Sequence, residues 1–163
     1  LIYTAFKNEN KILICGNGGS AADAQHLSAE YLVRLRPKVN RKPLPVISLA
    51  LDTSTITACG NDYSFDKLFS RNFEALVKNG DLLICISTSG NSKNILNVLK
   101  AAKKKKIQSI SFLGKGGGKA KKLSTLSIIV PHSNIARIQE AHIFLGHFIF
   151  ETVEYFLIKK KLI

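Results

Sequence analysis

Cysteine is scarce in this 163-residue chain, and no two cysteines have the CxxC spacing of a thiol-based metal or redox site. The three cysteines are an odd number, and Cys15 and Cys85 lie inside apolar runs typical of buried strands. We therefore expect Cys15, Cys59 and Cys85 to be reduced thiols, as in a cytoplasmic protein, rather than partners in disulfides. A catalytic cysteine has no support in the sequence.

Long apolar runs are also missing, since none approaches the ~20 residues that span a bilayer. Residues 1–7 are too short a start for a signal peptide, so we expect a soluble, cytoplasmic protein with no membrane partner. No internal repeat and no linker rich in Pro, Gly or Ser divides the chain, and we expect one domain over residues 1–163. Because the chain opens with Leu1 and reaches an apolar run at Lys11, we also expect an N-terminal helical segment to precede it.

Acidic residues are few: 11 Asp and Glu against 24 Lys and Arg give a formal charge of +13. So basic a chain could bind nucleic acid or anionic substrates. The lysines gather at 103–106, 115–122 and 159–161, in loops or at helix ends, where they complement the helix dipole and stay solvated. They lack interleaved aromatic residues, and no helix-turn-helix or RNP motif accompanies them. We favour a solvated surface, with a nucleic-acid patch as the alternative.

Apolar runs of strand length alternate with segments of helical period. Strands are predicted at residues 11–15, 45–50, 81–86, 108–113 and 126–130. Helices are predicted at residues 20–35, 66–78, 92–104 and 134–158, with polar turns after residue 50. Near-continuous apolar strands indicate a parallel sheet that is covered on both faces. The predicted fold class is therefore α/β, a three-layer α/β/α sandwich with a five-stranded parallel sheet, whose ligands bind beyond the carboxyl ends of the strands.

The first predicted strand is followed by the turn Gly16-Asn17-Gly18-Gly19-Ser20. Its glycines let the backbone approach a ligand closely, and the start of the next helix offers N–H groups to an anion. The turn is neither GxGxxG nor a P-loop, so dinucleotide and nucleoside triphosphate binding lose their main motif. A tight connection with no ligand is the alternative interpretation.

The third predicted strand is followed by Ser87-Thr88-Ser89-Gly90-Asn91-Ser92, again at the start of a helix. Hydroxyls and backbone amides there form a neutral cradle that suits a phosphate monoester. A helix cap would explain one of the four hydroxyls, so phosphate binding is favoured.

Two predicted helices carry groups that can bind a metal or move protons. His26 and Glu30 are i and i+4 on one helix and share a face. The last helix carries further polar groups: Gln139, Glu140, His142 and His147. An imidazole and a carboxylate on adjacent turns can serve either purpose, although a lone helical histidine is more often structural.

Four segments together resemble the signatures of one family. They are Cys15 to His26, Gly60 to Asp62, Ile86 to Ser92 and Ala136 to His142, within a match from Lys11 to Glu154. They are similar to those of the phosphoheptose isomerases, which have the SIS (sugar isomerase) fold. The resemblance implies an enzyme that interconverts sedoheptulose 7-phosphate and D-glycero-D-manno-heptose 7-phosphate, the first step towards the heptose of lipopolysaccharide cores. It also implies a homotetramer with sites at subunit interfaces, and a zinc ion in each subunit.

Carried over position by position, the resemblance implies specific site residues. The sugar contacts are Asn17, Gly18 and Gly19, and the phosphate contacts are Ser87, Thr88, Ser89 and Ser92. Further substrate-binding positions are Glu30, Arg34, Asn61, Asp62 and Gln139. The zinc ligands are His26, Glu30, Gln139 and His147. The residue before Arg137 is an acid in some relatives and Ala136 here, which weakens a role for an acid at that position.

Glu30 and His147 also match the family's catalytic pair. Isomerisation moves a proton between neighbouring carbons through an enediol, and a carboxylate base with a second proton donor can do this. Glu30 fits the base and His147 the acid. The nearest competing relatives, the DnaA-binding replication initiator proteins, share both turns but lack the acid matching Glu30 and the imidazole matching His147. This chain has both, so we expect the isomerase, with the initiator-binding protein as the alternative.

The last predicted helix raises two questions of assembly. Gln139 and His147 are eight residues apart, about 12 Å along a helix, so the two side chains could only just converge on one ion. The alternative is that one of them, or His142, comes from a neighbouring subunit. The helix is also apolar on too many sides to face one sheet, which indicates an oligomer. Its apolar residues are Ile143, Phe144, Leu145, Phe148, Ile149, Phe150, Val153, Phe156 and Leu157.

Overall fold

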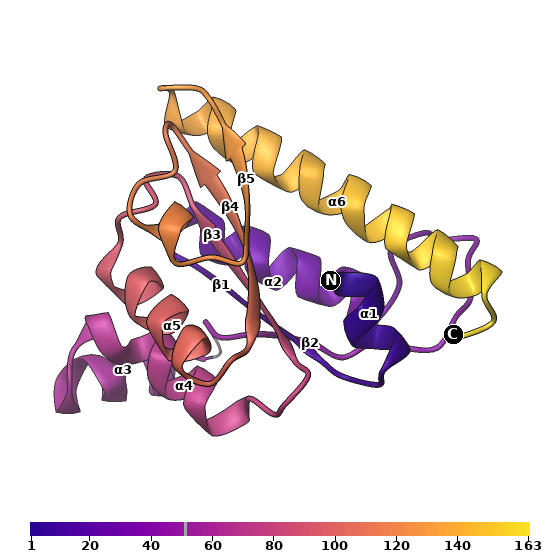
Figure 1. Ribbon diagram of the computed structural model, residues 1–163, viewed down its shortest axis with the longest axis horizontal. Coiled ribbons are helices and arrows are strands. Elements are labelled where there is room, and N and C mark those ends of the chain that lie inside the picture. Colours follow the sequence, from indigo (N-terminus) through magenta and orange to yellow (C-terminus); the bar gives the residue numbers. More distant parts are fainter. Residues whose placement is uncertain (51) are drawn as a thin grey trace.

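A five-stranded sheet forms the centre of the structure, a computed structural model that describes residues 1–50 and 52–163. All neighbouring strands are parallel, in the order β2-β1-β3-β4-β5 (Figure 1). The strands are β1 (Ile12–Gly16), β2 (Val46–Ser48), β3 (Leu82–Ser87), β4 (Gln108–Gly114) and β5 (Leu126–Val130). β1 and β3 are buried along their whole length, because both of their faces are covered. The predicted five-stranded parallel sheet is confirmed.

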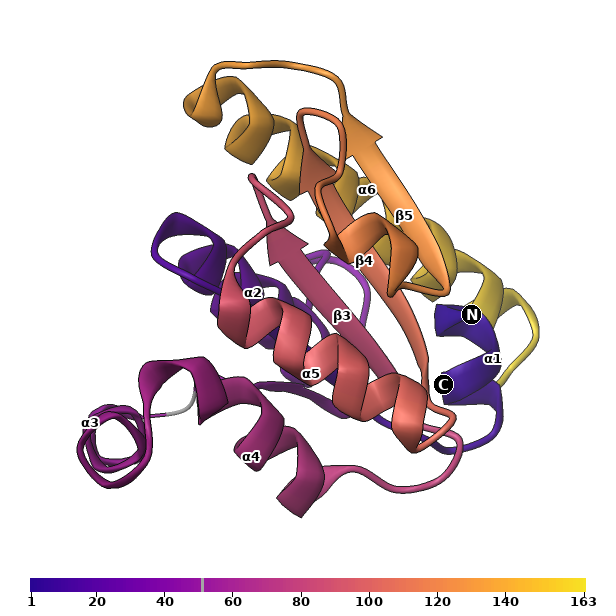
Figure 2. The same ribbon diagram turned by 60° about the vertical axis from the view of Figure 1, so that its left-hand side comes forward.

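Helices cover both faces of this sheet (Figure 2). On one face lie α1 (Ile2–Lys7), α2 (Gly19–Leu32) and α6 (Ile135–Lys159). On the other lie α3 (Thr53–Asp62), α4 (Leu68–Leu76) and α5 (Lys93–Lys104), with the 3₁₀ helices η1 (Phe65–Lys67) and η2 (Ala120–Lys122). Alternate residues of the strands feed two separate cores: Ile14 packs towards α2 and α6, and Leu13 towards α4 and α5. The three-layer α/β/α sandwich is therefore confirmed.

Several predicted boundaries were wrong. α2 ends at Leu32 rather than at Leu35, because the backbone leaves helical geometry at its C-cap residue Val33 (φ −109°, ψ −81°). The segment after β2, expected as polar turns, contains α3, whose start is capped by Asp52 accepting the Thr55 N–H at 2.8 Å. The helix expected over 66–78 is η1 followed by α4, which ends at Leu76. α1 was not predicted.

The helix α6 is long and apolar enough, by length and composition alone, to cross a membrane, which the expectation of no such segment overlooked. The core helix of a soluble protein passes the same test. One side of α6 packs on the sheet, where Gly146 approaches α2 so closely that a Cβ would lie 2.7 Å from Leu27 Cδ1. Nearer the C-terminal end of α6, the fully buried Glu154 accepts hydrogen bonds from Arg36 Nε and Arg41 Nε, each at 2.8 Å. These contacts anchor α6 to α2 and to the segment that follows it.

All three cysteines are buried and free, as expected. Cys15 on β1 and Cys85 on β3 are directly paired across the sheet, and their Sγ atoms are 3.6 Å apart. Burial, and then the contact with Cys85, raises the pKa of the Cys15 thiol well above its usual range. Because the thiolate is the reactive form, Cys15 is a packing residue of the sheet.

The strand order places the two polar turns side by side. β2, the next strand in the chain, lies on one side of β1, and β3 lies on the other side, so the order of the strands reverses direction at β1. In open parallel sheets, ligands bind beyond the carboxyl ends of the strands at such a switch point. Gly16, at the end of β1, pairs with Ile86, one residue before the end of β3. The turns that begin at Asn17 and at Thr88 therefore start next to each other.

Candidate active site

The first turn, between β1 and α2, requires glycine at Gly16 and Gly19 for lack of room and at Gly18 for its backbone conformation. A Cβ on Gly16 would lie 2.3 Å from the Ser20 carbonyl oxygen, and Gly18 has a φ of +56°. A Cβ on Gly19 would lie 2.6 Å from Gln139 Nε2, so the amide of Gln139 lies against the start of α2. The Ser20 and Ala21 N–H groups at the start of α2 donate to the Asn17 and Gly18 oxygens, at 3.0 and 2.9 Å, so the turn is closed by its own backbone. The glycines leave the backbone of the turn uncovered by side chains.

Two of the four hydroxyls shape the second turn, between β3 and α5. Ser87 Oγ accepts the Gly90 N–H at 3.1 Å, and Ser89 Oγ accepts the Asn91 N–H at 3.2 Å. Each hydroxyl oxygen accepts one hydrogen bond from the backbone, and its O–H group remains able to donate one. These two hydrogen bonds fix the backbone of the turn and orient both hydroxyls. Ser87 is buried, and Ser89 is partly exposed.

The other two hydroxyls have different surroundings. Across residues 1–50 and 52–163, the side chains of Thr88 and Ser92 make no hydrogen bond, and both are partly exposed. Ser92 is the N-cap residue of α5, yet its hydroxyl does not cap the helix. Asn94 Oδ1 accepts the Ile95 N–H at 2.9 Å in the first turn of α5, whereas the Thr88 and Ser92 hydroxyls keep their O–H groups beside it, as the predicted anion-binding cradle requires.

A pair of asparagines links the two turns. Asn17 Nδ2 donates to Asn94 Oδ1 at 2.9 Å, and Asn94 Nδ2 donates back to Asn17 Oδ1 at 2.8 Å. Asn94, on the first turn of α5, is only 2% exposed. The pairing fixes the first turn to the start of α5, and it occupies part of the Asn17 amide expected to contact sugar.

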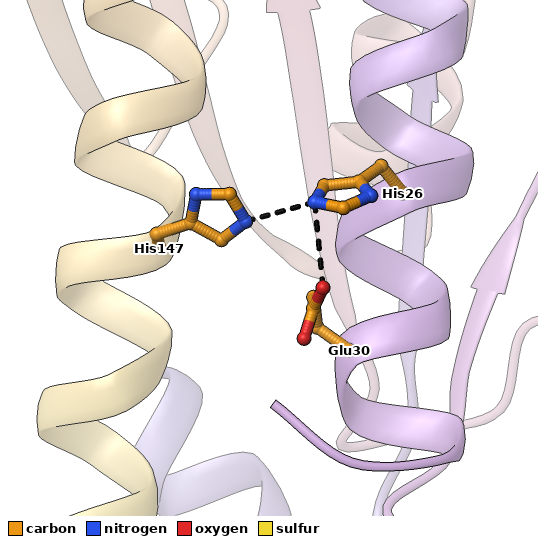
Figure 3. A group of neighbouring side chains, drawn as sticks. All are labelled: His26, Glu30 and His147. Carbon is orange, nitrogen blue, oxygen red and sulfur yellow. Dashed lines mark hydrogen bonds and ion pairs between the residues drawn. The ribbon is translucent and has the colours of Figure 1, made fainter. Parts of the chain in front are cut away.

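His26, Glu30 and His147 meet in one cluster at the interface of α2 and α6 (Figure 3). The Nε2 atoms of His26 and His147 are 2.9 Å apart, and His26 Nε2 is 3.3 Å from Glu30 Oε1. His26 is the most exposed of the three, and Glu30 and His147 are partly buried. The structure thus joins the predicted catalytic pair, Glu30 and His147, at one place.

The same cluster fits a divalent metal. One ligand atom from each residue lies within 4.8 Å of the other two. Two imidazole nitrogens and a carboxylate oxygen are a donor set that zinc prefers, and tetrahedral zinc with bonds near 2.0 Å separates its ligands by about 3.3 Å. The observed separations of 2.9 and 3.3 Å are close to that spacing.

Other predicted site residues are less closely connected. Gln139, the fourth predicted ligand, lies against Gly19. Arg34 is exposed beyond the end of α2, and Asn61 and Asp62 are exposed at the end of α3, where the Asn61 amide donates to Asp62 Oδ1 at 2.8 Å. Within residues 1–50 and 52–163 of one chain, none of these three hydrogen-bonds to either polar turn.

A partly buried acid, Asp23, and a buried imidazole, His142, have charges that act on the pKa values of one another. The sequence had suggested His142 only as an alternative ligand from a neighbouring subunit and had given Asp23 no role. His142 is fully buried, and neither its ring nitrogens nor Asp23 Oδ2 have a hydrogen-bond partner in the described part of the chain. Burial lowers the pKa of His142, opposed by the Leu113 backbone and the charge of Asp23. Burial also raises the pKa of the Asp23 carboxyl, opposed by His142, His26 and His147.

The sequence contained a pattern that could have identified Asn94 as a residue with a special role. Asn94 occupies a position of α5 that shares its buried side with Ile95, Val98 and Ala102, where the helical period calls for apolar residues. An asparagine there needs partners for its amide, and these lie in the turn after β1.

Fold and site together define a class of protein: a parallel α/β/α domain with two polar strand-to-helix turns at the strand switch. The SIS domain family matches residues 1–114. A phosphoheptose isomerase of Campylobacter concisus is 53% identical over 154 residues, which cover 94% of this chain and 80% of the relative. The chain belongs to the SIS domain family and, within it, to the phosphoheptose isomerases.

Solved structures agree with this assignment. The phosphoheptose isomerase of Neisseria gonorrhoeae is 42% identical with a TM-score of 0.86, over 94% of this chain and 81% of that one. The enzyme of Francisella tularensis is 35% identical with a TM-score of 0.86, over 93% of this chain and 82% of that one. The resemblance inferred from the four sequence signatures is confirmed, and the initiator-binding alternative gains no support from these relatives.

Proposed function

We propose that this protein is a cytoplasmic aldose-ketose isomerase that converts sedoheptulose 7-phosphate into D-glycero-D-manno-heptose 7-phosphate, for heptose and lipopolysaccharide core biosynthesis. The observation that carries the proposal is the joining of Glu30 from α2 and His147 from α6 in one cluster. These are the two residues that distinguish the isomerases from the initiator-binding relatives. Membership of the phosphoheptose isomerases supports the choice of substrate.

The phosphate of the substrate binds in the second turn. The free hydroxyls of Thr88 and Ser92, and the O–H groups of Ser87 and Ser89, supply donors without a cation. The first turn, Asn17, Gly18 and Gly19, holds the sugar. Because Gln139 lies against Gly19, it is placed to contact the sugar as well. Arg34, Asn61 and Asp62 complete the substrate site from the family pattern.

The reaction moves two hydrogens and no other atom. A proton leaves C1 of the ketose while the C2 carbonyl oxygen gains one, which gives the 1,2-enediol. A proton then returns to C2, and the C1 hydroxyl loses one to become the aldehyde. Glu30 serves as the base that carries the carbon-bound proton, and His147 exchanges protons with the oxygens. The neighbouring His26, 3.3 Å from Glu30, holds the carboxylate in place.

Zinc is the proposed cofactor, one ion in each subunit. His26, Glu30 and His147 would hold it, and Gln139, of the same chain or of a neighbouring copy, would complete the set. When bound, the ion would polarise the carbonyl of the substrate.

The proposed assembly is a homotetramer with its sites at subunit interfaces. The support is the outer side of α6, which carries exposed aromatic residues along the helix. They are Phe144, Phe148, Tyr155 and Phe156. Soluble proteins rarely leave such a row of large apolar side chains uncovered.

The direct test is a coupled assay that supplies sedoheptulose 7-phosphate and detects the aldose product. The purified protein should form D-glycero-D-manno-heptose 7-phosphate, with and without added zinc tested in parallel. If neither condition gives product while the protein is folded and binds the sugar phosphate, the isomerase proposal is wrong, and a binding role takes its place.

A further inference from the structure

The connection from β4 to η2, residues 115–119, packs against the back of the turn that follows β3. β3 and β4 are neighbours in the sheet, so the two connections leave it side by side (Figure 2). The contact is too tight for any side chain. A Cβ on Gly90 would lie 2.1 Å from the Gly117 carbonyl oxygen, and a Cβ on Gly118 would lie 2.5 Å from the Ser89 carbonyl oxygen.

Three successive carbonyl oxygens of the phosphate turn lie against the segment from Gly114 at the end of β4 to Ala120 at the start of η2. The Thr88 oxygen lies where a Cβ on Gly114 would be 2.5 Å away, and the Ser89 oxygen faces Gly118. The Gly90 oxygen accepts the Ala120 N–H at 2.9 Å. The carbonyls of the turn are therefore directed to the side of β4 and η2.

A side chain of the turn fastens the same contact. Asn91 Oδ1 accepts the Lys119 N–H at 3.1 Å, and Asn91 Nδ2 donates to the Ser89 oxygen at 3.1 Å. The connection is itself held in shape, because the Gly117 N–H donates to the Gly114 oxygen at 2.9 Å.

The direction of the carbonyls decides what the turn can bind. In a planar trans peptide the C=O and the N–H point in opposite directions, so fixing one fixes the other. A turn whose carbonyls faced the ligand would repel an anion, whereas one whose amides and hydroxyls face it attracts one. The oxygens of Thr88, Ser89 and Gly90 are turned towards β4. The Gly90 and Asn91 N–H groups donate to Ser87 Oγ and Ser89 Oγ, so the Ser89 N–H and the hydroxyl O–H groups are the donors of the turn that are left for the phosphate.

We propose that residues 114–120 are a positioning element that sets phosphate affinity by holding the carbonyls of the Ser87–Ser92 turn away from the ligand. The inference rests on the proposed function, because it takes the second turn as the phosphate site. Gly117, Gly118 and Asn91 act through the turn and are positioning residues. Gly117 and Gly118 have no side chain that could reach the substrate.

The connection supplies its own matched control. Gly118 has a φ of +54° and meets Ser89, whereas nothing lies within 4 Å of a Cβ on Gly116. Gly116 does not have positive φ, so alanine is unstrained there. Gly118→Ala therefore disturbs the contact with the turn, and Gly116→Ala makes the same chemical change in open space. Asn91→Ala loosens the contact without adding any atom.

The experiment measures the affinity for inorganic phosphate by isothermal titration calorimetry, and then kcat and KM for sedoheptulose 7-phosphate. In Gly118→Ala the Kd for phosphate should rise about tenfold or more, with KM rising by the same factor and kcat kept within about threefold. Asn91→Ala should shift Kd and KM in the same direction by a smaller factor. Gly116→Ala should match the wild type in all three constants.

Each outcome decides the inference. A folded Gly118→Ala protein with wild-type phosphate affinity, or one in which kcat falls while KM and Kd stay unchanged, overturns it. So does a wild-type protein that does not bind phosphate. Should Gly118→Ala fail to fold, unchanged affinity in Asn91→Ala overturns the inference and weakened affinity supports it. Because calorimetry needs no turnover, a protein that binds phosphate in this pattern but isomerises nothing would refute the proposed function alone.

Discussion

Asn17 and Asn94 exchange two side-chain hydrogen bonds, of 2.9 and 2.8 Å, and so tie the turn after β1 to the helix that starts at the turn after β3. Asn94 Oδ1 also accepts the Ile95 N–H at 2.9 Å, which orients the amide. We therefore expect the spacing of the two proposed substrate turns to depend on the buried amide of Asn94.

Asn94→Ala should weaken substrate binding. Removing the buried amide leaves Asn17 without its partner and frees the first turn, a loss of about 1–3 kcal/mol in hydrogen bonding. We expect a higher KM for sedoheptulose 7-phosphate and a lower melting temperature. Asn97→Ala is the control, because its Nδ2 donates to the Asp66 oxygen at 2.9 Å on the same helix and away from both turns. Equal KM effects in the two variants would refute the coupling of the turns.

Binding of the substrate phosphate should depend on the hydroxyls of the turn after β3 and not on the lysine clusters. Thr88→Val combined with Ser89→Ala removes two donors at the turn, so KM for the sugar phosphate should rise by about tenfold or more. Replacing Lys103 to Lys106 with glutamine should change KM little, since these residues lie at the far end of α5 from Ser92. Loss of substrate binding in the lysine variant, together with salt-sensitive binding of nucleic acid, would favour the basic patch instead.

The periodicity of apolar residues predicted the most apolar strands and helices, and it did not predict a helix whose start depends on a local cap. The five strands were recoverable because strands buried on both faces have unbroken apolar runs, as in Leu82–Ser87. α3 was missed because its residues are polar and mostly exposed, and its start depends on the cap at Asp52 rather than on a buried face. α2 was overextended because the backbone leaves helical geometry at Val33, and beyond it Arg36 hydrogen-bonds to Glu154 of α6, a distant contact that helical periodicity does not show.

The candidate site shows the same division. The spacing of His26 and Glu30 placed them on one face of a helix, and the structure adds His147 from a helix more than one hundred residues later in the chain. No periodicity could show that contact, which depends on how α2 and α6 pack. The link from Asn17 to Asn94 is equally a product of strand order, because β1 and β3 are neighbours only in the sheet.

The outer side of α6 should hold copies of the chain together. Phe144 and Phe148 are 67% and 59% exposed, and their rings stack with centroids 6.5 Å apart. Light scattering should show a tetramer, and Phe144→Glu with Phe148→Glu should dissociate it, because charge in an apolar interface is costly. Phe65→Glu is the control, since Phe65 is 52% exposed but lies on η1, across the sheet. A wild-type protein that is monomeric at micromolar concentration would contradict the shared-site assembly.

Glu30→Gln should abolish most of the activity and keep the fold. The substitution preserves size and hydrogen bonding but removes the charge that a base needs, so kcat should fall by about 10² to 10⁴ with KM largely kept. His147→Asn should act similarly. Because both residues are also proposed metal ligands, the zinc content of each variant has to be measured with its rate. Wild-type turnover in Glu30→Gln would show that Glu30 is not the base.

Stability should fall as the pH drops below about 6.5, the usual pKa of histidine, because of His142. Burial lowers the pKa of His142 in the folded protein, so the unfolded chain binds its proton first as the solution is acidified. The free energy of unfolding then decreases with falling pH, by at most about 1.4 kcal/mol per pH unit for one proton, until the folded pKa is reached. The charge of Asp23 opposes this shift without reversing it.

The measurement is urea unfolding at pH 7.5 and at pH 5.5. His142→Phe keeps an aromatic ring beside Phe112, whose centroid is 6.2 Å from that of His142, and removes the titrating group. The loss of stability between the two pH values should therefore be smaller in this variant than in the wild type. His132→Gln is the control for the loss of a histidine, because His132 is exposed and lies outside the core. An identical pH dependence in His142→Phe and the wild type would show that a different group is responsible for the acid sensitivity.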